Sequence, residues 1–477
     1  MSILYLESFD DELYAKRSSA WAGTTPNSSY GAHGKGTLLG DSVGKYYRIP
    51  YVGSGARIII GFNYYFSAGP TGVQSIASLH TTGYSKLAYD AANDRIGLMV
   101  KPNTVASYYY WGAIGDVPGG EWHYVEWNIL PSTGSAGTVS MYVDGALSGS
   151  SYSSIDYYTL PNQIQLGDTA SDGVDQWWCD DVYVCDDTGG VNDDVLGPIE
   201  VVPLLPDGNG TYSNLTGQDA DKTDNYLNVD EATPDDGTTY NGSATEGDED
   251  TYTMDDLTGT PDVVGAVLSM NAAKTDSGAK FMRAIARTAD SLVDYTTTPT
   301  ITSSSEYSTY TPGKAWRAVA DYWVSATVGS TEWWKADFGS AKDFGKVDFE
   351  LYSGGSTYPT VVDLQYSDND SDWYNAADQL TGVTATTYEV SVDSDVTSHR
   401  YWRLLFSSFS GSSGMEADNI YFYEVSATAG DTVGTSKALG VSYGLHEEVF
   451  DLNPGTFKLW TYTTLNGTEF GAEVRNS

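Results

Sequence analysis

Short runs in which apolar and polar residues alternate, each bounded by glycine, proline or Asp-Gly, constrain the fold of this chain more than any other feature. Residues 138–144 alternate strictly and end on Asp144-Gly145, a strong signal for a β-hairpin turn. In residues 57–66 every second side chain is apolar, which places one strand face in a core. Residues 121–130 are apolar on both faces, as in a central strand. This pattern predicts an all-β chain of tandem β-sandwiches.

Composition supports this fold class and excludes several functions. Of 477 residues 51 are glycine and 13% are aromatic, which favours strands and turns over helices. The net charge of −40 leaves too few cations to replace the counterions of a nucleic acid, so we expect no nucleic-acid partner. No run of about 18 apolar residues occurs, and the first residues lack the basic start of a signal peptide, so we expect no membrane insertion. At roughly 150 residues per domain, the length predicts about three domains.

Cysteine and histidine contribute little chemistry. Cys179 and Cys185 are six residues apart in one expected strand. They should point the same way with Cα atoms about 20 Å apart, too far for a disulfide. The five histidines are scattered singly and no pair has the spacing of zinc ligands. We interpret both cysteines as core or flanking residues.

The first 195 residues resemble a known family. Leu4–Asp10 is similar to the start of domains found in structural proteins of tailed bacteriophages. The resemblance implies a jelly-roll sandwich and a virion context, and it implies no activity. The segments that resemble the laminin-G or concanavalin-A-like jelly roll are Gly120–Val125, Gly137–Gly145, Gln165–Gly167 and Asp180–Val184.

Residues 196–299 change character. Residues 207–256 hold 14 acidic residues and a single lysine, yet apolar residues interrupt them regularly, which a solvated linker would not need. Pro203–Gly208 and Asn225–Glu231 resemble a second module of the same phage proteins, and this favours strands. The periodicity of Pro261–Lys280 leaves a short helix and a strand open.

Residues 300–428 form the third expected unit. Trp334 followed by Asp337-Phe338-Gly339 is similar to the Trp and Asp-Leu-Gly of the discoidin family, also called coagulation-factor type C. Later strands such as Arg400–Phe406 and Ile420–Val425 follow in the order of that family. The paired cysteines near the domain ends of the family are absent. The resemblance implies a β-sandwich similar to many carbohydrate-binding modules.

The last stretch, 430–477, is too short to fold alone and too apolar for a disordered tail. Its motifs resemble the end of the phage module that begins near residue 197. We therefore expect a discontinuous middle domain, residues 196–299 plus 430–477, with the discoidin-like unit inserted in it. Domain insertion succeeds at exposed loops because domain termini tend to lie close together.

We expect no catalytic residues. Glu121 and Glu126 are the best carboxylate pair for glycoside hydrolysis, but five residues separate them, so they point to opposite strand faces. No glycine-rich phosphate loop precedes a helix. The chain is therefore predicted not to be an enzyme.

We expect no cofactor, although the sequence leaves open whether the chain binds Ca²⁺. Carboxylates are the hard oxygen ligands that Ca²⁺ prefers, but no EF-hand loop is present, and solvating charge is the competing role. Asp180 and Asp181 are a second open case, because jelly rolls often bind Ca²⁺ at their loops. The acidic candidates are Asp219, Asp221, Asp224, Asp230, Glu231, Asp235 and Asp236.

Aromatic side chains in two loops are the best chemical lead. Sugar rings stack their C–H faces on Trp and Tyr, while polar side chains bind the hydroxyls. The loops 352–358 and 368–374 combine both residue types. The alternative is that these rings only close the end of the sandwich. The candidate carbohydrate-binding residues are Tyr352, Tyr358, Asp372, Trp373 and Tyr374.

The sequence thus predicts a bacteriophage virion protein of the tail-fibre, spike or head-decoration type. It would be assembled in the host cytoplasm and exposed on the particle. Its expected partners are other virion proteins, further copies of itself and host surface polysaccharide. Two alternatives stay open, a purely architectural virion protein without a ligand and a polysaccharide-degrading enzyme.

Overall fold

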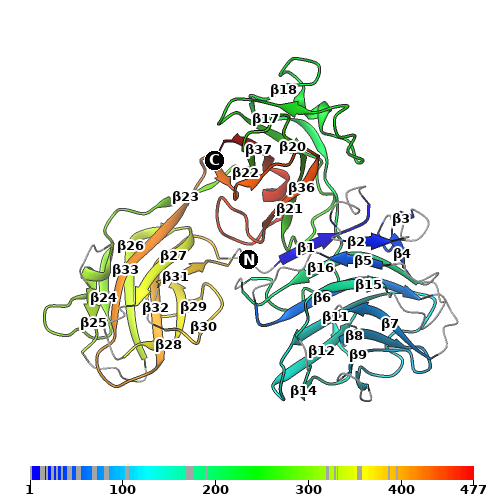
Figure 1. Cartoon of the computed structure of the whole chain (residues 1–477). Coiled ribbons are helices and arrows are strands. Elements are labelled where there is room, and N and C mark those ends of the chain that lie inside the picture. Colours follow the sequence, from blue (N-terminus) through cyan, green and yellow to red (C-terminus); the bar gives the residue numbers. More distant parts are fainter. Residues whose placement is uncertain are drawn as a thin grey trace.

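The computed structural model contains three β-rich units joined through the middle one (Figure 1). All sheet pairings between the described strands are antiparallel, and the all-β class of tandem sandwiches is confirmed. No helix among the described residues is long and apolar enough to cross a membrane. The structure describes residues 3–10, 17, 20–22, 26–27, 31–33, 36–39, 46–49, 55–66, 72–79, 85–101, 107–157, 160–167, 177–188, 191–317, 322–326, 329, 331–351, 357–384, 387–393 and 396–476.

The first unit packs two sheets face to face. One sheet has, in spatial order, β13 (Ala146–Leu147), β12 (Gly137–Val143), β11 (Trp122–Leu130), β6 (Ile58–Phe66), β16 (Trp177–Cys185), β4 (Gly36–Leu39) and β3 (Pro26–Asn27), with β1 (Ile3–Glu7) on β16 and β14 (Tyr152–Ile155) on β12. The other has β10 (Tyr108–Trp111), β9 (Arg95–Val100), β8 (Ser85–Asp90), β7 (Val73–Ser78), β15 (Ile164–Gly167), β5 (Tyr46–Ile49) and β2 (Ala20–Ala22).

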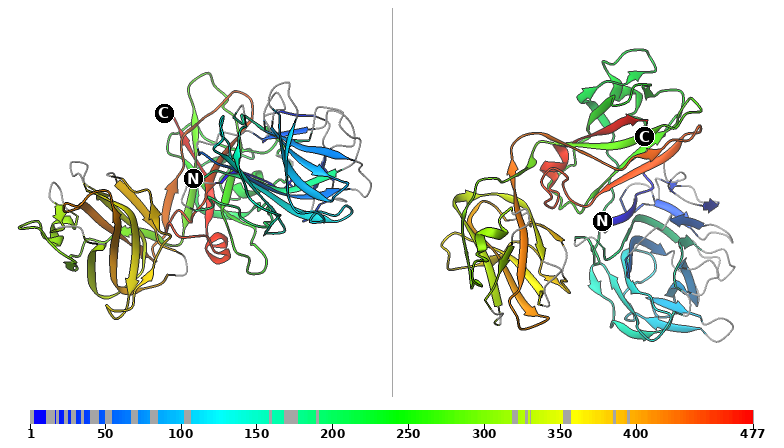
Figure 2. Two further views of the ribbon diagram at one scale, coloured as in Figure 1. Left: turned by 90° about the horizontal axis from the view of Figure 1, so that it is seen from below. Right: turned by 60° about the vertical axis from the view of Figure 1, so that its left-hand side comes forward.

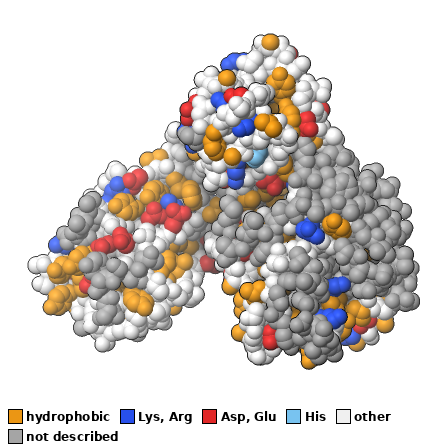
Figure 3. Space-filling model, in the orientation of Figure 1, with side chains coloured by type: hydrophobic (Ala, Val, Ile, Leu, Met, Phe, Trp, Pro, Cys, Tyr) orange, Lys and Arg blue, Asp and Glu red, His pale blue; other side chains and the backbone are white. Residues whose placement is uncertain are grey.

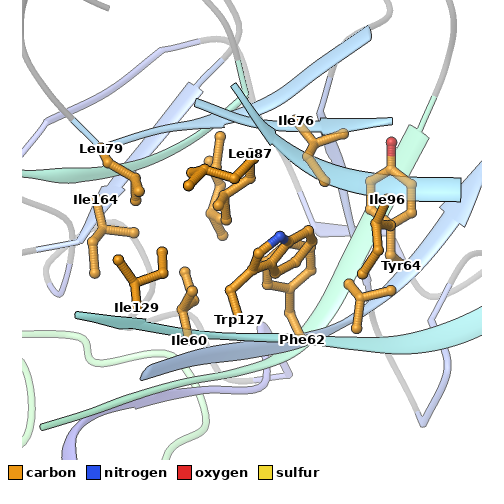
Figure 4. Packing of buried hydrophobic residues seen from close by; sticks show 14 of the residues in the cluster. Ile60, Phe62, Tyr64, Ile76, Leu79, Leu87, Ile96, Trp127, Ile129 and Ile164 are labelled. Carbon is orange, nitrogen blue, oxygen red and sulfur yellow. The ribbon is translucent and has the colours of Figure 1, made fainter. Parts of the chain in front are cut away.

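Large aliphatic and aromatic side chains fill the space between these sheets (Figure 4). Trp127 of β11 is fully buried and stacks on Phe62 of β6, with ring centroids 5.7 Å apart. Ile60 and Ile129 lie beside them, and Leu87 comes from the opposite sheet. Burial of alternate residues from both sheets explains the alternation in the sequence.

A β-bulge in β16 separates the two cysteines. Asp180 pairs with Asn63 but Tyr183 pairs with Gly61, so two residues of β16 lie opposite one residue of β6. Asp181 has φ +49°, in the left-handed region. The expectation that Cys179 and Cys185 face the same way is therefore wrong. Cys179 packs in the core between the sheets and Cys185 in a cluster on the outer side, and both are free thiols.

The middle unit is built from chain segments that are far apart in sequence. Its main sheet has, in order, β17 (Pro206–Ser213), β20 (Glu249–Met254), β37 (Glu469–Arg475), β22 (Phe281–Thr288) and β34 (Gly430–Val433), with β35 (Lys437–Ala438) also on β22. A second pair is β21 (Ala266–Ala272) with β36 (Gly444–Phe450), and a third is β18 (Thr216–Gly217) with β19 (Asn241–Gly242). The helical turns are η1 (Asn225–Asn228) and α2 (Tyr462–Asn466).

The ambiguous stretch after Pro261 contains a strand, β21. Met270 of β21 is 8% exposed, and Ala266 and Leu268 pack against the same cluster as Phe450 and Phe470. Residues from 430–477 thus supply part of the core of this unit.

The third unit is a two-sheet sandwich, shown at the left of Figure 1. One sheet has β23 (Ser291–Asp294), β33 (Glu416–Ser426), β27 (Phe344–Leu351) and β31 (Thr387–Ser391), with β25 (Tyr322–Val324) on β33. The other has β24 (Thr300–Ser303), β26 (Thr331–Lys342), β32 (His399–Phe409), β28 (Pro359–Ser367) and β29 (Tyr374–Asn375), with β30 (Leu380–Thr381) on β28; the turn η2 (Pro312–Ala315) lies beside them. Trp334, Trp402 and Phe422 form an aromatic core between the sheets.

The middle unit contacts both of its neighbours (Figure 2). On one side the backbone N–H of Ile3 donates to Asp451 Oδ1 at 2.8 Å, and Val449 packs against the cluster that holds Ile3. On the other side Lys458 Nζ donates to Asp343 Oδ1 at 2.7 Å and to the Val396 carbonyl at 2.8 Å.

Candidate ligand-binding face

The two loops expected to bind carbohydrate lie at opposite ends of β28. Tyr358 directly precedes this strand, whereas Asp372 and Trp373 belong to the turn that follows it. Nine residues of extended strand place the two ends about 25–30 Å apart. The two loops therefore do not form one site. Tyr352 lies outside the described residues.

The turn after β28 is held by its own hydrogen bonds. Asn369 Oδ1 accepts from the backbone N–H groups of Ser371 and Asp372, both at 2.9 Å. Asn369 Nδ2 donates to Asp372 Oδ2 at 2.7 Å. Asp370 has φ +60°, as a tight turn of this kind requires. The carboxylate of Asp372 thus fixes the turn that carries Trp373.

Trp373 lies over the guanidinium group of Arg403. The Cζ atom of Arg403 is 4.2 Å from the indole centroid. Arg403 is on β32 and alternates with Trp402 and Leu404, which are buried, so its side chain is on the outer face of the sheet. Arg403 Nε donates to Gln365 Oε1 at 2.8 Å, and Gln365 Nε2 donates to Asn375 Oδ1 at 2.8 Å.

Strand register extends this group into a row across the outer face. Lys335 of β26 is opposite Arg403, Arg403 is opposite Gln365, and Gln365 is opposite Asn375. Lys335 Nζ is 5.3 Å from the ring centroid of Trp333, on the same face. We call this set the outer-face row: Trp333, Lys335, Arg403, Gln365, Asn375 and Trp373. It presents two partly exposed indoles with amide and cationic donors between them.

The two cations of the outer-face row differ in their partners. Lys335 Nζ is bound to both carboxylate oxygens of Asp370, at 2.7 and 2.8 Å. Arg403 forms no ion pair within the described part of the chain. Burial lowers the pKa of Arg403, although the negative charges of Asp370 and Asp363 partly offset this effect. Arg403 therefore keeps N–H donors for a ligand.

Tyr374 faces away from the outer-face row. It pairs with Tyr366, whose ring packs against the core and stacks on His399 with centroids 3.8 Å apart. His399 Nδ1 is 3.1 Å from both carboxylate oxygens of Asp368. Tyr374 is 58% exposed at this sheet edge, so its side chain and that of Trp373 lie on different surfaces of the unit.

Sequence reasoning missed Trp333, Lys335, Gln365 and Arg403 as site residues. Trp333, Lys335 and Arg403 alternate with buried residues along their strands, and this signal assigns them to the outer face. Gln365 joins them because it lies opposite Arg403. Figure 3 shows hydrophobic, acidic and basic side chains gathered together on the visible side of the third unit.

A second aromatic surface lies on the first unit. Tyr109 and Trp111 of β10 stack with centroids 5.2 Å apart and an interplanar angle of 3°. Gly97 permits this, because a Cβ there would lie 2.3 Å from the Trp111 ring. A hollow of about 340 Å³ beside them is lined by Lys86, Tyr109 and other residues of β7, β8 and β9. The guanidinium of Arg95 lies over the Trp111 ring, and it forms an ion pair with Asp90 Oδ2 at 2.8 Å.

The acidic pair Asp180 and Asp181 is surrounded by donors. Asp180 accepts from the backbone N–H groups of Ala32, His33 and Asp181. Asp181 Oδ2 accepts from Asn63 Nδ2 at 2.8 Å and lies 2.7 Å from His33 Nδ1. Asp181 Oδ1 accepts from the backbone N–H of Val201 at 2.8 Å. Both carboxylates of this pair are thus engaged by hydrogen-bond donors.

The electrostatics of this pair follow from its enclosure. Burial, helped by the charge of Asp181, raises the pKa of Asp180 to about 8. Burial lowers the pKa of His33, but the hydrogen bond and charge of Asp181 outweigh it, and the net pKa is raised.

Glu121 and Glu126, the carboxylates considered for hydrolysis, differ in burial and in their partners. Glu126 is fully buried and accepts from Tyr183 Oη at 2.6 Å and from the Gly197 backbone at 2.9 Å. Burial raises its pKa. The side chain of Glu121 is 63% exposed and 4.0 Å from His123.

Comparison with known proteins assigns the third unit to a family. Residues 300–416 match the F5/8 type C domain, so this part of the chain is a discoidin-like domain. No curated protein matches the chain in sequence.

Solved structures similar to the chain include chitosan-binding module 1 of a chitosanase/glucanase from Paenibacillus sp. IK-5. It has 16% identity and a TM-score of 0.23, covering 27% of this chain and 94% of that one. The CBM32 of AlyQ in complex with 4,5-unsaturated mannuronic acid has 18% identity and a TM-score of 0.23, with coverages of 27% and 97%. The endo-β-1,4-glucuronan lyase of the fungus Trichoderma reesei has 14% identity and a TM-score of 0.29, with coverages of 38% and 95%.

Proposed function

We propose that the chain is a carbohydrate-binding protein whose ligand lies on the outer-face row of the third unit. The observation that carries the proposal is the position of Trp373 over Arg403, in register with amide side chains across four strands. A family match to the F5/8 type C domain supports a binding module on this unit.

The chemistry of the row suits a sugar. The two indoles offer apolar faces for the C–H side of a sugar ring. Gln365 and Asn375 present amides, and Arg403 presents guanidinium N–H groups, for the ring hydroxyls. Because β32 lies between β26 and β28, the backbones that carry Trp333 and Gln365 are about 10 Å apart, and Trp373 reaches the face from beyond β28. A ligand of more than one ring could therefore contact both indoles.

We propose binding without catalysis. Glu126 is enclosed and bonded to Tyr183 and the backbone, which suits a structural role. The outer-face row itself holds no pair of unoccupied carboxylates among the residues described, since Asp370 is bound to Lys335.

The setting we propose is the virion of a tailed bacteriophage, where the chain would present the third unit to host surface glycans. This rests on the sequence resemblance of Leu4–Asp10 and of the middle unit to phage structural proteins. Mass spectrometry of purified particles of a phage that encodes the chain would test it, since a virion protein must co-purify with the particle.

A glycan array probed with the full chain tests the binding proposal. We expect binding to a defined set of glycans, and its loss in Trp373→Ala. Tyr307→Ala is the matched control, because Tyr307 is a 57% exposed aromatic elsewhere in the same unit. Trp111→Ala tests the aromatic surface of the first unit.

The outcomes separate the alternatives. Loss of binding in Trp111→Ala but not in Trp373→Ala would move the site to the first unit. A chain that binds no glycan would be an architectural protein. Release of new reducing ends from a bound polysaccharide would make it an enzyme.

A further inference from the structure

We propose that the turn 219–225 of the middle unit is a Ca²⁺ site. Its carboxylate ligands are Asp219, Asp221 and Asp224. The fourth ligand would be the side-chain amide oxygen of Asn225. The turn follows β18, which is labelled at the top of Figure 1, and leads into η1.

The spacing of the carboxylates fits one ion of this size. One carboxylate oxygen from each of Asp219, Asp221 and Asp224 lies within 4.8 Å of the other two. Oxygens that bind the same Ca²⁺ at 2.3–2.6 Å can be up to about 5 Å apart, so a single ion can reach all three. We name Ca²⁺ because its coordination is flexible, whereas Mg²⁺ at 2.0–2.1 Å demands nearly octahedral geometry.

The three carboxylates have no cationic partner in the part of the chain that the structure describes. Lys222 is the only lysine between residues 207 and 256, and no arginine occurs there. Its Nζ donates to the backbone carbonyl of Asn214 instead. Three like charges thus lie close together, and a divalent cation would offset their repulsion.

Asn225 is an independent indication of a ligand. It is fully buried, and its Nδ2 donates to the Leu215 carbonyl at 2.9 Å and to Asp250 Oδ2 at 2.6 Å. These two bonds fix the orientation of the amide, and its Oδ1 has no hydrogen-bond donor among the described residues. A buried amide oxygen without a partner is costly, and such oxygens are common Ca²⁺ ligands.

This oxygen lies near the carboxylate of Asp219, beside Gly217. A Cβ on Gly217 would lie 3.3 Å from Asn225 Oδ1 and 2.5 Å from Asp219 Oδ1, so both oxygens face the space above this glycine. Asn228 Nδ2 reaches the same glycine, but it donates to Asn241 Oδ1 at 3.1 Å. Any side chain at position 217 would fill the space that the two oxygens share.

The remaining acidic candidates do not join the group. The hydroxyl of Thr239 donates to both Glu231 and Asp235, which ties them to each other. Sequence reasoning named seven acidic residues, and the structure gathers three of them.

An ion here would fasten the turn to the main sheet. Asp250 of β20 is 1% exposed and accepts from Asn225 Nδ2 and from the backbone N–H of Leu215 at 2.8 Å. Ca²⁺ bound to Asn225 would therefore restrain the turn against β20. It would stabilise the folded middle unit, because a ligand that binds only the folded state shifts unfolding by mass action.

Calorimetric titration of the EDTA-treated full chain with CaCl₂ tests the proposal. We expect one saturable site per chain with a Kd below about 1 mM, and a thermal transition that moves to higher temperature with Ca²⁺. In the double variant Asp219→Asn with Asp221→Asn we expect at least tenfold weaker binding. Both residues are exposed, so the variant should fold, which its circular dichroism spectrum checks.

Asp256→Asn is the matched control, since Asp256 is an exposed carboxylate of the same unit outside the turn. We expect it to bind Ca²⁺ as the parent does. The proposal is overturned if the parent shows neither saturable heat nor a Ca²⁺-dependent transition. It is also overturned if the double variant binds as tightly as the parent.

Discussion

Thr288, the last residue of β22, lies directly opposite Gly430, the first residue of β34, in the main sheet of the middle unit. A few residues further out Ser291 lies opposite Ser426 in a sheet of the third unit. The chain thus enters and leaves the third unit through two adjacent antiparallel strands. Opposite residues in such strands have Cα atoms about 4.5–5.5 Å apart.

This geometry predicts that the third unit can be removed without loss of the rest. Joining Thr288 to Gly430 through a short glycine-containing turn replaces the third unit by a hairpin. We expect a soluble protein with the first and middle units folded, shown by cooperative thermal unfolding in calorimetry. An aggregated product would show instead that contacts such as Lys458 with Asp343 are needed for folding.

Removal of residues 430–477 should have the opposite effect. β37 lies between β20 and β22, so its loss exposes an unpaired edge on each of these two strands in the centre of the main sheet. Trp460 and Phe470 would also leave the core. We expect aggregation, measured by light scattering after expression, and a soluble cooperative product would contradict the shared core.

Phe470→Ala is the milder test of the same core. Phe470 is 7% exposed and packs near Phe450 and Trp460. Its truncation should lower the free energy of unfolding by about 3–5 kcal/mol. Denaturant unfolding measures this, with Val441→Ala as control because Val441 is 74% exposed.

The stability of the first unit should fall as pH rises from about 4 to about 8. The pKa of Asp180 is about 8 in the folded chain, against an ordinary value of 3.8 for an aspartate, so between these values the folded state binds the proton that the unfolded state has released. The stabilising contribution is complete below about pH 4 and is lost by about pH 8. The pKa of His33 is also raised, so its contribution to the free energy of unfolding likewise decreases as pH rises above about 6.5.

Denaturant unfolding of the parent and of Asp180→Asn across this range measures the effect. The difference in free energy of unfolding between the two proteins should change by a few kcal/mol between about pH 4 and about pH 8. Parallel curves would show that Asp180 does not titrate in this window.

Alternation in the sequence is enough to predict the strands and the fold class, because burial of one face leaves a period of two residues. It also assigns Trp333 and Arg403 to an outer face, since each alternates with core residues. Which outward residues meet depends on the register between β26, β32 and β28. These strands are far apart in sequence, and no local pattern encodes their pairing.

Two features of the structure were not predicted, for different physical reasons. The bulge at Asp181 is defined by the pairing of β16 with β6. Residue spacing within β16 alone therefore could not show that Cys179 and Cys185 point to opposite faces of the sheet. The separation of Tyr358 from Trp373 was deducible, because loops that flank one strand lie at its opposite ends. The cluster at Asp219 needed the fold, since it is completed by Asn225 through its bonds to β20.

Carbohydrate binding through the outer-face row should depend on the number of copies presented. A ring stacked on one indole gains about 1–3 kcal/mol, by analogy with base stacking, so a single site should have a Kd on the order of millimolar. Coupling many copies of the full chain to one particle raises the apparent affinity by avidity without new contacts. We expect weak binding of the monomer to host cells and strong binding of the particle. Trp373→Ala should abolish particle binding, whereas Tyr358→Ala should not, because Tyr358 lies at the far end of β28. Flow cytometry with labelled particles measures all three, and binding that needs Tyr358 rather than Trp373 would place the site at the opposite end of the sandwich.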